Sequence, residues 1–152
     1  MKKGRWVPIE LAKGDPRPCP ECGCSEARIG RLGKTRFIAA IEPWHGNQVV
    51  IYRQSGGAWQ RNVIDDKLVD GHTIITADLN GDGSDEVIAG YRGQGRSVYL
   101  YSFGGGAWTR STLDGGGMGA AACAAADLNG DKRIDVVCIG SATANLKWYE
   151  NR

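Results

Sequence analysis

The sequence predicts an all-β protein that contains about three β-propeller blades, each a four-stranded antiparallel sheet. An acidic loop occurs twice, at residues 78–86 and 127–135, with the two copies 49 positions apart. Both loops place oxygen-bearing side chains at positions 1, 3, 5 and 9 and are followed directly by an apolar run. Neighbouring segments repeat with the same spacing, and a period near 50 residues is typical of solenoids and propellers.

The repeat extends well beyond the acidic loops. A Gly-Gly-Ala-Trp run at 56–59 recurs at 105–108, and Tyr52 recurs as Tyr101 and as Tyr149. The apolar and aromatic runs are short and are separated by glycine-rich turns, which favours strands over long helices. These recurrences set the phase of the strands in every unit.

Four strands are predicted in each unit. The first enters the acidic loop, the second leaves it as a continuous apolar run, the third ends in tyrosine and the fourth starts at tryptophan. Their ranges are 72–77, 87–89, 98–101 and 108–113 in the middle unit, 120–126, 136–139 and 146–149 in the last, and 49–52 and 59–64 for the last two strands of the first unit. The alanine run 120–126 also permits a short helix, but the matching stretch in the other copy is β-branched, which favours a strand.

The chain is expected to be a single domain, 1–152, in which residues 1–35 form a divergent first unit. Aligning residues 37–39 with 87–89 sets Arg28, Gly30 and Leu32 opposite Asp78, Asn80 and Asp82. The loop at 28–36 has therefore lost its carboxylates and is not expected to hold calcium in the same way. A guanidinium in place of the cation is one alternative.

The blade count has a consequence for assembly. Residues 4–11 match the fourth strand at 57–64, so the chain contains a lone fourth strand, two complete units and a last unit without a fourth strand. Closed propellers have four to eight blades, and an open end exposes unpaired strand edges. The chain is therefore expected to be part of a longer propeller or half of a homo-oligomer, most simply a two-chain ring of six blades.

Composition and charge narrow the possible partners. The net charge is only +2 over 152 residues, so no nucleic-acid partner is expected. No apolar run of 18 residues exists, so no membrane span is expected. The basic amino terminus has no apolar segment behind it, so no signal peptide is predicted. The five cysteines are an odd number, which argues against a complete disulfide framework and leaves the compartment open.

The run Asp-x-Asn-Gly-Asp-Gly-x-x-Glu-Val-Ile-Ala-Gly at 78–90 resembles the FG-GAP/VCBS repeat family of integrin-type propellers and many extracellular bacterial proteins. Segments 41–48 and 70–72 are more narrowly similar to the propeller of aldos-2-ulose dehydratase-like proteins, which are metal-dependent lyases acting on oxidised sugars. The broad resemblance implies structural calcium, a binding or scaffolding role toward carbohydrate or protein, and an extracellular or periplasmic location. The narrow one implies a carbohydrate lyase as the alternative.

Calcium takes six to eight oxygen ligands, which alternate residues of a tight loop supply. By the resemblance, the first site would use side chains of Asp78, Asn80, Asp82 and Glu86 and the carbonyl of Ser84, and the second those of Asp127, Asn129, Asp131 and Asp135 and the carbonyl of Arg133. Lys132 stands where the first loop has Gly83, so the second site is expected to be weaker. The alternative is an acidic turn held by Asx hydrogen bonds without metal.

Both histidines, His45 and His72, fall at strand ends on one predicted rim, opposite the acidic loops. With Glu42 they form a candidate His/His/carboxylate site for Zn²⁺ or another divalent metal, where a sugar carbonyl would be polarised. Tyr91 or a carboxylate would then move the proton. The alternative is that both histidines only hydrogen-bond to backbone groups.

Three further residues are candidates for contact with a ligand at this rim. Trp44 does not repeat and lies in a loop, so it is a candidate for stacking, whereas Trp59 and Trp108 repeat with the fold and are predicted to pack between blades. Arg92 and Arg96, in the equivalent loop of the next unit, are candidates for holding an anionic oxygen.

The cysteines give no complete metal site. Cys19, Cys22 and Cys24 resemble one zinc knuckle, but a structural zinc needs four ligands and no second pair exists. A chance occurrence or a redox-labile surface cluster is favoured over zinc, and the alignment of Cys22 with His72 leaves a channel-facing ligand role open. Cys123 and Cys138 lie within predicted strands and are interpreted as small buried hydrophobic residues.

Overall fold

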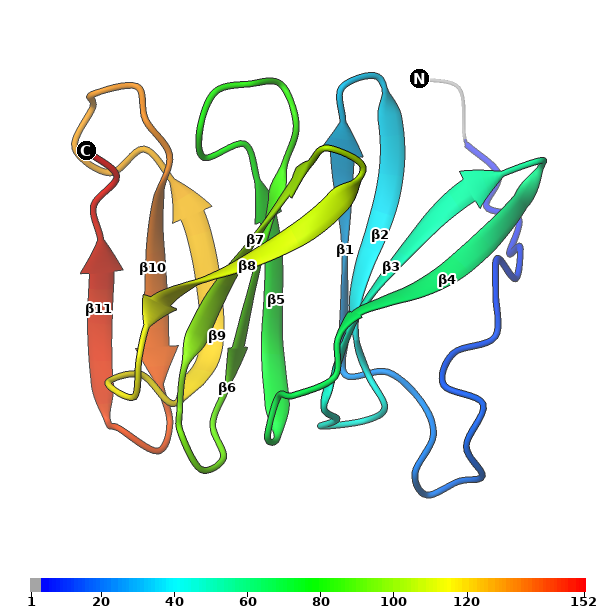
Figure 1. Cartoon of the computed structure of the whole chain (residues 1–152), viewed down its shortest axis with the longest axis horizontal. Helices are drawn as coiled ribbons and strands as arrows, with labels where there is room; N and C mark the ends of the chain where they lie inside the picture. Colours follow the sequence, from blue (N-terminus) through cyan, green and yellow to red (C-terminus); the bar gives the residue numbers. More distant parts are fainter. Residues whose placement is uncertain (1–3) are drawn as a thin grey trace.

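The computed structural model describes residues 4–152, which form three antiparallel sheets standing side by side in a row (Figure 1). Sheet 1 contains β1 (Glu26–Leu32), β2 (Thr35–Glu42), β3 (Gln48–Ser55) and β4 (Ala58–Asp65). Sheet 2 contains β5 (Gly71–Ala77), β6 (Glu86–Tyr91), β7 (Val98–Gly104) and β8 (Ala107–Asp114). Sheet 3 contains β9 (Ala120–Ala126), β10 (Asp135–Gly140) and β11 (Asn145–Tyr149).

The prediction of an all-β fold made of propeller-type blades is confirmed. In each sheet the strand order follows the chain and every neighbouring pair is antiparallel. The alanine run 120–126 is strand β9, in which exposed and half-buried residues alternate as in a sheet. The three sheets form an open row rather than a closed ring (Figure 1). Within residues 4–152 no helix has the length and apolar character needed to cross a membrane.

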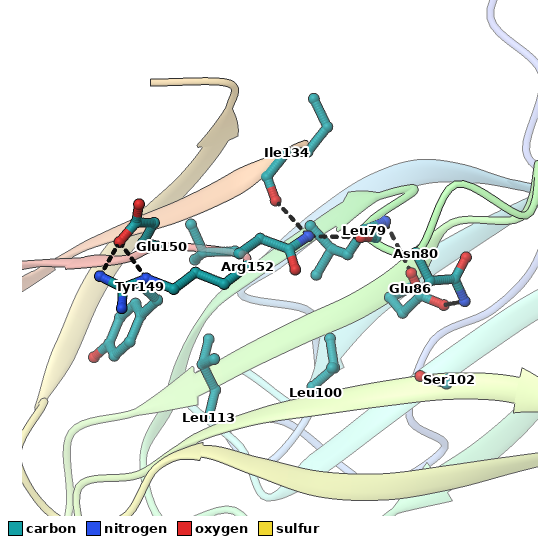
Figure 2. A pocket seen from close by; sticks show the side chains of 12 residues that line it. Leu79, Asn80, Glu86, Leu100, Ser102, Leu113, Ile134, Tyr149, Glu150 and Arg152 are labelled. Atoms are coloured by element: carbon teal, nitrogen blue, oxygen red, sulfur yellow. Dashed lines mark hydrogen bonds and ion pairs between the residues drawn. The ribbon is translucent and has the colours of Figure 1, made fainter. Parts of the chain in front are cut away.

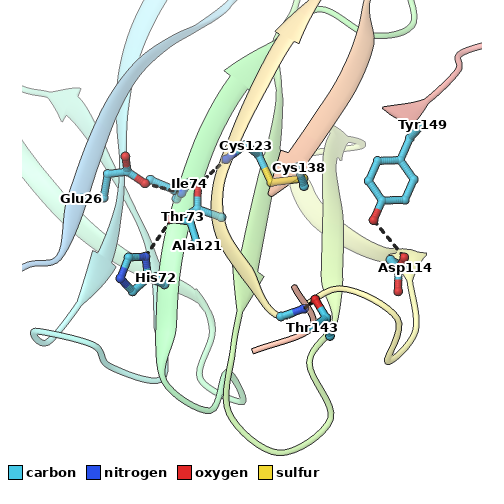
Figure 3. The surroundings of a disulfide bond; sticks show 11 residues. Glu26, His72, Thr73, Ile74, Asp114, Ala121, Cys123, Cys138, Thr143 and Tyr149 are labelled. Carbon is cyan, nitrogen blue, oxygen red and sulfur yellow. Dashed lines mark hydrogen bonds between the residues drawn. A yellow bond between two sulfur atoms is a disulfide. The ribbon is translucent and has the colours of Figure 1, made fainter. Parts of the chain in front are cut away.

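The first strands of the three sheets, β1, β5 and β9, lie next to one another. The amide of Ile74 donates to Oε2 of Glu26 at 2.7 Å, which joins β5 to β1. The amide of Cys123 donates to Oγ1 of Thr73 at 3.1 Å, which joins β9 to β5 (Figure 3). These strands therefore hold the innermost position that the repeat predicts for them.

Two apolar clusters fill the spaces between the sheets. Strand β6 is buried along its whole length because it has a neighbouring sheet on each face. Val87 and Ala89 pack toward sheet 1, whereas Ile88 packs toward sheet 3. The continuous apolar run of this strand is thus explained by two-sided burial.

A repeated polar link joins each fourth strand to the following sheet. Asp65, at the end of β4, accepts hydrogen bonds from the hydroxyl of Tyr101 and the guanidinium of Arg110, both at 2.8 Å. Asp114, at the end of β8, accepts from the hydroxyl of Tyr149 at 2.9 Å and from Lys147 at 2.6 Å. Tyr101 and Tyr149 therefore bind the carboxylate of the preceding blade, whereas Tyr52 donates to Glu42 of its own sheet.

The alignment of the first unit was wrong by one residue. Tyr52 lies opposite Ile38, and Tyr101 lies opposite Val87, so Ile38 rather than Phe37 is equivalent to Val87. A shift of one residue moves every side chain of a strand to the other face of its sheet. Both runs are apolar on both faces, so their sequence pattern did not fix the register.

The predicted loop at 28–36 was also wrong, because its residues form a tight hairpin. Arg28 and Gly30 lie within β1, and only Gly33 and Lys34 separate β1 from β2. A Cβ atom on Gly30 would stand 2.2 Å from the ring of Phe37, so glycine is needed for that ring to pack flat on β1. By register, the position of Asp78 is taken here by Arg31.

The predicted lone strand at 4–11 is not formed, since no strand occurs between residues 4 and 25. The physical reason is the lack of a free neighbour: β3 of sheet 1 is already paired with β4, and β11 lies at the far end of the row (Figure 1). Trp6 is 96% exposed. Residues 12–25 run along sheet 1, where Asp15 bonds to Arg17 at 2.9 Å and lies 3.7 Å from Arg61.

Four of the five cysteines are paired. Cys123 and Cys138, interpreted from the sequence as separate hydrophobic residues, lie directly opposite each other on β9 and β10 and form a disulfide (Figure 3). Cys19 and Cys22 form a second disulfide, so neither is free to act as a metal ligand. Cys24 is the free, exposed cysteine. The sequence alone did not predict the disulfide between Cys123 and Cys138, because this pairing depends on the register of two apolar strands.

Candidate functional site

The first acidic loop, residues 78–86, is folded around its own backbone amides. The carboxylate of Asp78 accepts hydrogen bonds from the amides of Gly81 at 2.8 Å and Gly83 at 2.9 Å. Both glycines have positive φ angles, of 75° and 88°, which L side chains rarely adopt. The sequence thus folds locally into the Asx-type turn that was weighed as the alternative to a metal site.

The side-chain oxygens of this loop converge. The amide nitrogen of Asn80 donates to Oδ2 of Asp82 and to Oε1 of Glu86, both at 3.1 Å. Burial raises the pKa of Glu86, and the charges of Asp82 and Asp78 raise it further. A partly buried group of carboxylate and amide oxygens, in which neighbouring carboxylates repel one another, is a donor set that suits a hard cation such as Ca²⁺.

A neighbouring blade contacts the first loop from outside. Arg31 of β1 places its guanidinium 3.4 Å from Oδ2 of Asp78 and 3.6 Å from Oδ1 of Asp85. Its backbone amide donates to Asp85 at 3.0 Å, and its carbonyl accepts from the amide of Asp85 at 2.7 Å. The β1–β2 hairpin is therefore docked on the acidic loop of sheet 2.

The second acidic loop, residues 127–135, repeats the internal hydrogen bonds of the first. Asp127 accepts from the amides of Gly130 at 2.7 Å and Lys132 at 2.9 Å. Lys132 has a φ of 72°, so it holds a left-handed conformation where the first loop has glycine. Asn129 donates to Asp131 and to Glu150, both at 3.2 Å, instead of to the residue at position 9.

Position 9 of the second loop is committed to backbone groups. Asp135 is fully buried and accepts from the amides of Leu128 at 3.1 Å and Asn151 at 2.8 Å. Glu86 accepts from the equivalent amide of Leu79 at 2.9 Å but also reaches Asn80 in the loop, whereas Asp135, one methylene shorter, bonds to backbone amides alone. The donor set of the second loop therefore suits a cation less well than that of the first.

Across residues 4–152, no three His, Cys, Asp or Glu side chains stand in an arrangement that could hold a metal ion. In the acidic loops this reflects the carboxylates' bonds to backbone amides. The chemistry of the first loop fits calcium, and a bound ion would draw the same oxygens onto itself. Calcium at either loop accordingly remains a prediction.

The two histidines lie together at the opposite end of β5 from the first acidic loop. Their ring centroids are 5.0 Å apart. The ring of Trp44 stacks on His45 with a centroid distance of 4.4 Å, yet Trp44 remains 61% exposed. A solvent-facing aromatic surface therefore stands beside two imidazoles.

Asp70 and Arg92 hold His45 in place. Arg92 donates to Oδ2 of Asp70 at 2.8 Å and to Nδ1 of His45 at 3.0 Å. His45 and Asp70 have positive φ angles, of 51° and 61°, although neither is glycine. Such conformations are costly and gather at functional sites and ligand-binding loops.

The hydrogen bonds assign complementary roles to the two imidazoles. In its bond with Arg92, which can only donate, Nδ1 of His45 accepts, so the proton of the neutral ring lies on Nε2. The same Nδ1 lies 3.3 Å from Oδ1 of Asp70, a contact that protonation of the ring would turn into an ion pair. Nδ1 of His72 lies 2.9 Å from the carbonyl oxygen of Ala121, which can only accept, so this nitrogen carries the proton (Figure 3). The neutral pair thus presents one donor, from His45, and one acceptor, from His72.

Glu42 lies in a different network from the histidines. It is 1% exposed, accepts a hydrogen bond from the hydroxyl of Tyr52 and forms an ion pair with Arg61 at 2.8 Å. Burial, followed by the contact with Glu42, raises the pKa of Tyr52. The carboxylate predicted as the third metal ligand is therefore already paired, and Asp70 is the carboxylate beside His45.

Among the described residues, neither Tyr91 nor Arg96 hydrogen-bonds to the histidine pair, although Tyr91 lies opposite Gly71, the residue before His72. Tyr91 is 6% exposed, and its hydroxyl lies 3.4 Å from Oγ of Ser97. Burial raises its pKa, which makes it a poor proton shuttle at neutral pH. The backbone of Arg96 closes the β6–β7 turn through a 3.1 Å bond to Gly93.

Sequence reasoning missed Asp70, Arg31 and Glu150. Asp70 stands two residues before His72, so the spacing was a signal that it lies near the histidine. Arg31 was hidden because a two-residue turn replaces the acidic loop in the first unit, so an alignment without gaps set Arg28 rather than Arg31 opposite Asp78. Glu150 follows the recurring tyrosine directly and had no counterpart in the other units to draw attention to it.

Comparison with known proteins agrees with this structure. Residues 78–138 match the family model of the FG-GAP-like repeat, so the matched segment begins at the first residue of the first acidic loop. The chain is 32% identical over 108 residues to aldos-2-ulose dehydratase of Phanerodontia chrysosporium, a match that covers 59% of this chain and 12% of that protein. The chain thus corresponds to a small part of its curated relative. The acidic loops, the blade-like sheets and these two matches show that the chain is similar to FG-GAP-like repeat proteins, with the repeat itself matched over residues 78–138.

Proposed function

We propose that this propeller-type scaffold is stabilised by calcium and binds carbohydrate at the rim around Trp44, His45, His72 and Arg92. The observation that carries the proposal is the exposed ring of Trp44, stacked on an imidazole that is itself fixed by Arg92. Apolar faces of sugars pack on such rings, and their hydroxyl groups need both donors and acceptors. The two imidazoles supply one of each.

A titration with glucose and with glucuronate tests the binding proposal. We expect Trp44→Ala to lose most of the affinity for either sugar, because it removes the stacking surface. Trp148→Ala is the matched control, since Trp148 is 50% exposed but lies on sheet 3. Unchanged binding by Trp44→Ala would exclude this rim. Binding of neither sugar by the wild type would favour a protein ligand instead.

The acidic loops support the calcium part of the proposal. Burial and, to a smaller extent, the charges of Asp82 and Asp78 raise the pKa of Glu86, and a cation in the first loop would relieve the repulsion between these charges. Excess calcium at 100 times its dissociation constant would add about 3 kcal/mol to the free energy of unfolding. Thermal melts with calcium and with a chelator measure this, and Asp78→Asn should reduce the difference more than Asp127→Asn. Equal midpoints in both conditions would count against occupied loops.

The proposal extends to assembly, either within a longer propeller or as a homo-oligomer. The outer face of sheet 3 exposes apolar side chains, with Leu146 71% and Ile139 52% accessible. These two residues lie opposite each other on β11 and β10. A contiguous apolar sheet face is normally covered by another layer.

The second candidate is a metal-dependent carbohydrate lyase. The 5.0 Å approach of His45 and His72 and the similarity to aldos-2-ulose dehydratase favour it. A bound Zn²⁺ would polarise a sugar carbonyl. His72 has its Nε2 lone pair available, whereas His45 would need to exchange its tautomer or its bond to Arg92. Equilibrium dialysis with Zn²⁺ tests this, with His72→Ala expected to abolish binding and Cys24→Ser to leave it unchanged.

A further inference from the structure

A groove of about 290 Å³ lies between sheet 2 and sheet 3 (Figure 2). Its walls come from β7 and β8 on one side and from β11 with the residues after it on the other. The apolar part of the lining consists of Leu79, Leu100, Leu113, Ile134, Val136 and Tyr149. This is an open apolar groove inside an otherwise filled blade interface.

The matching place between sheets 1 and 2 is filled by Trp108 of β8. Its ring packs edge-on to Phe37 of β2, with centroids 5.6 Å apart, and against Phe103 of β7 at 5.3 Å. In that cluster Ile51, Ile64 and Tyr101 hold the positions that Leu100, Leu113 and Tyr149 hold around the groove. The groove is therefore the place of the tryptophan of a fourth strand in sheet 3.

Residues 4–11 have the sequence of that strand. The spacing from Trp6 to Leu11 equals that from Trp59 to Ile64 and from Trp108 to Leu113. Trp6, Val7 and Ile9 are 96%, 64% and 74% exposed, so the segment leaves large apolar side chains uncovered on both of its faces. It also comes at the right place in the chain, because β4 and β8 each lead into the first strand of the next sheet and residues 4–11 lead into β1.

We propose that residues 4–11 of a second copy of this chain form the fourth strand of sheet 3, with Trp6 in the groove. The occupant is a second copy because a copy's own residues 4–11 lie beside sheet 1, at the opposite end of the row from β11 (Figure 1). This inference rests on the assembly proposed above. The exchange is reciprocal, and it brings sheet 1 of each copy onto the exposed apolar face of sheet 3 of the other.

The repeat fixes the register of the exchanged strand. Trp59 and Trp108 each lie opposite the residue two positions after the recurring tyrosine. Carried to β11, this rule sets Trp6 opposite Asn151, Pro8 opposite Tyr149 and Glu10 opposite Lys147. The last pair joins opposite charges, and a proline is tolerated in an outermost strand.

A disulfide cross-link tests the exchange. In a Cys24→Ser background, the double variant Glu10→Cys/Lys147→Cys should form a species of twice the chain mass under oxidising conditions, visible on a non-reducing gel. Glu10→Cys/Leu146→Cys is the matched control, since the side chain at 146 points to the other face of sheet 3. Trp6→Ala should raise the dimer dissociation constant about tenfold. Trp44→Ala should leave it unchanged.

Three results would overturn the proposal. Cross-linking only through position 146 would mean that the register is wrong. A dimer by sedimentation that forms no disulfide between positions 10 and 147 of the double variant would exclude strand exchange but leave the assembly standing. A strictly monomeric, folded chain at all concentrations would exclude both.

Discussion

The interface between sheets 1 and 2 and the interface between sheets 2 and 3 are built from the same repeat but are completed differently. Both have an aspartate at the end of a fourth strand that binds the recurring tyrosine of the next sheet. In the first interface Trp108 fills the space and Arg31 docks on the acidic loop. In the second, the place of the tryptophan is a groove. The difference indicates that the fourth strand of a sheet fills the interface between that sheet and the preceding one.

Removal of Trp108 should have the largest effect. Trp108→Ala would open in the first interface the same groove that the second already has, and we expect a loss of about 2–3 kcal/mol in the free energy of unfolding. Urea denaturation followed by circular dichroism measures it. Trp59→Ala, on the outer face of sheet 1, should cost less. Equal losses would mean that Trp108 does not have a special place between two sheets.

The aspartate–tyrosine links should come next. Asp65→Asn and Asp114→Asn remove a charged acceptor and should each cost about 1–2 kcal/mol at neutral pH. Similar losses would support the equivalence of the two links. A loss confined to Asp65→Asn would mean that the second interface does not depend on its carboxylate.

The pH dependence sharpens this test at Asp114. Burial opposes its ionisation, but hydrogen bonds from Lys147, Tyr149 and Gly117 outweigh burial and lower its pKa. A carboxylate whose folded pKa is depressed stabilises the protein above its unfolded pKa of about 4, and this contribution is lost as the pH falls through the folded value. The difference in stability between wild type and Asp114→Asn should therefore be full at pH 6 and shrink below about pH 4. A difference that grows on acidification would contradict this assignment.

Arg31 should contribute less, because its side chain is 47% exposed and its ion pairs are screened by solvent. Arg31→Met should cost about 0.5–1 kcal/mol in chelator. Arg36→Met, which changes an exposed arginine on the neighbouring strand β2, is the matched control and should be near neutral. If both variants behave alike in chelator melts, the docking of the β1–β2 hairpin does not depend on the guanidinium.

The smallest effect is expected at Lys132. Its φ of 72° is strained for a side chain, so Lys132→Gly should stabilise the protein by about 0.5 kcal/mol and tighten calcium binding at the second loop. The reverse change, Gly83→Lys, should destabilise the first loop by about 1 kcal/mol. Calcium titrations and thermal melts of both variants test the pair. Destabilisation by Lys132→Gly would show that strain is not what separates the loops.

Parts of the candidate site followed from the sequence, and parts did not. The position of His45 and His72 on one rim came from the strand phase, because each follows or begins a predicted strand. The partners of Glu42 could not be predicted from the sequence, since Tyr52 and Arg61 reach it from two other strands. The roles of the imidazole nitrogens depend on Arg92 and Ala121, which the chain brings close only after folding.

Apart from β1 and the strand expected at 4–11, the sequence by itself determined the strands, their order within each sheet and the internal hydrogen bonds of both acidic loops. These features depend on residues close in the chain: alternation, glycine at positive φ, and carboxylates a few positions from the amides they bind. Only the tertiary structure decided the register of the first sheet, the disulfide between Cys123 and Cys138, and the docking of Arg31 on the first loop. Each of these depends on which strand lies beside which, and apolar runs that are buried on both faces fit a neighbour in more than one register.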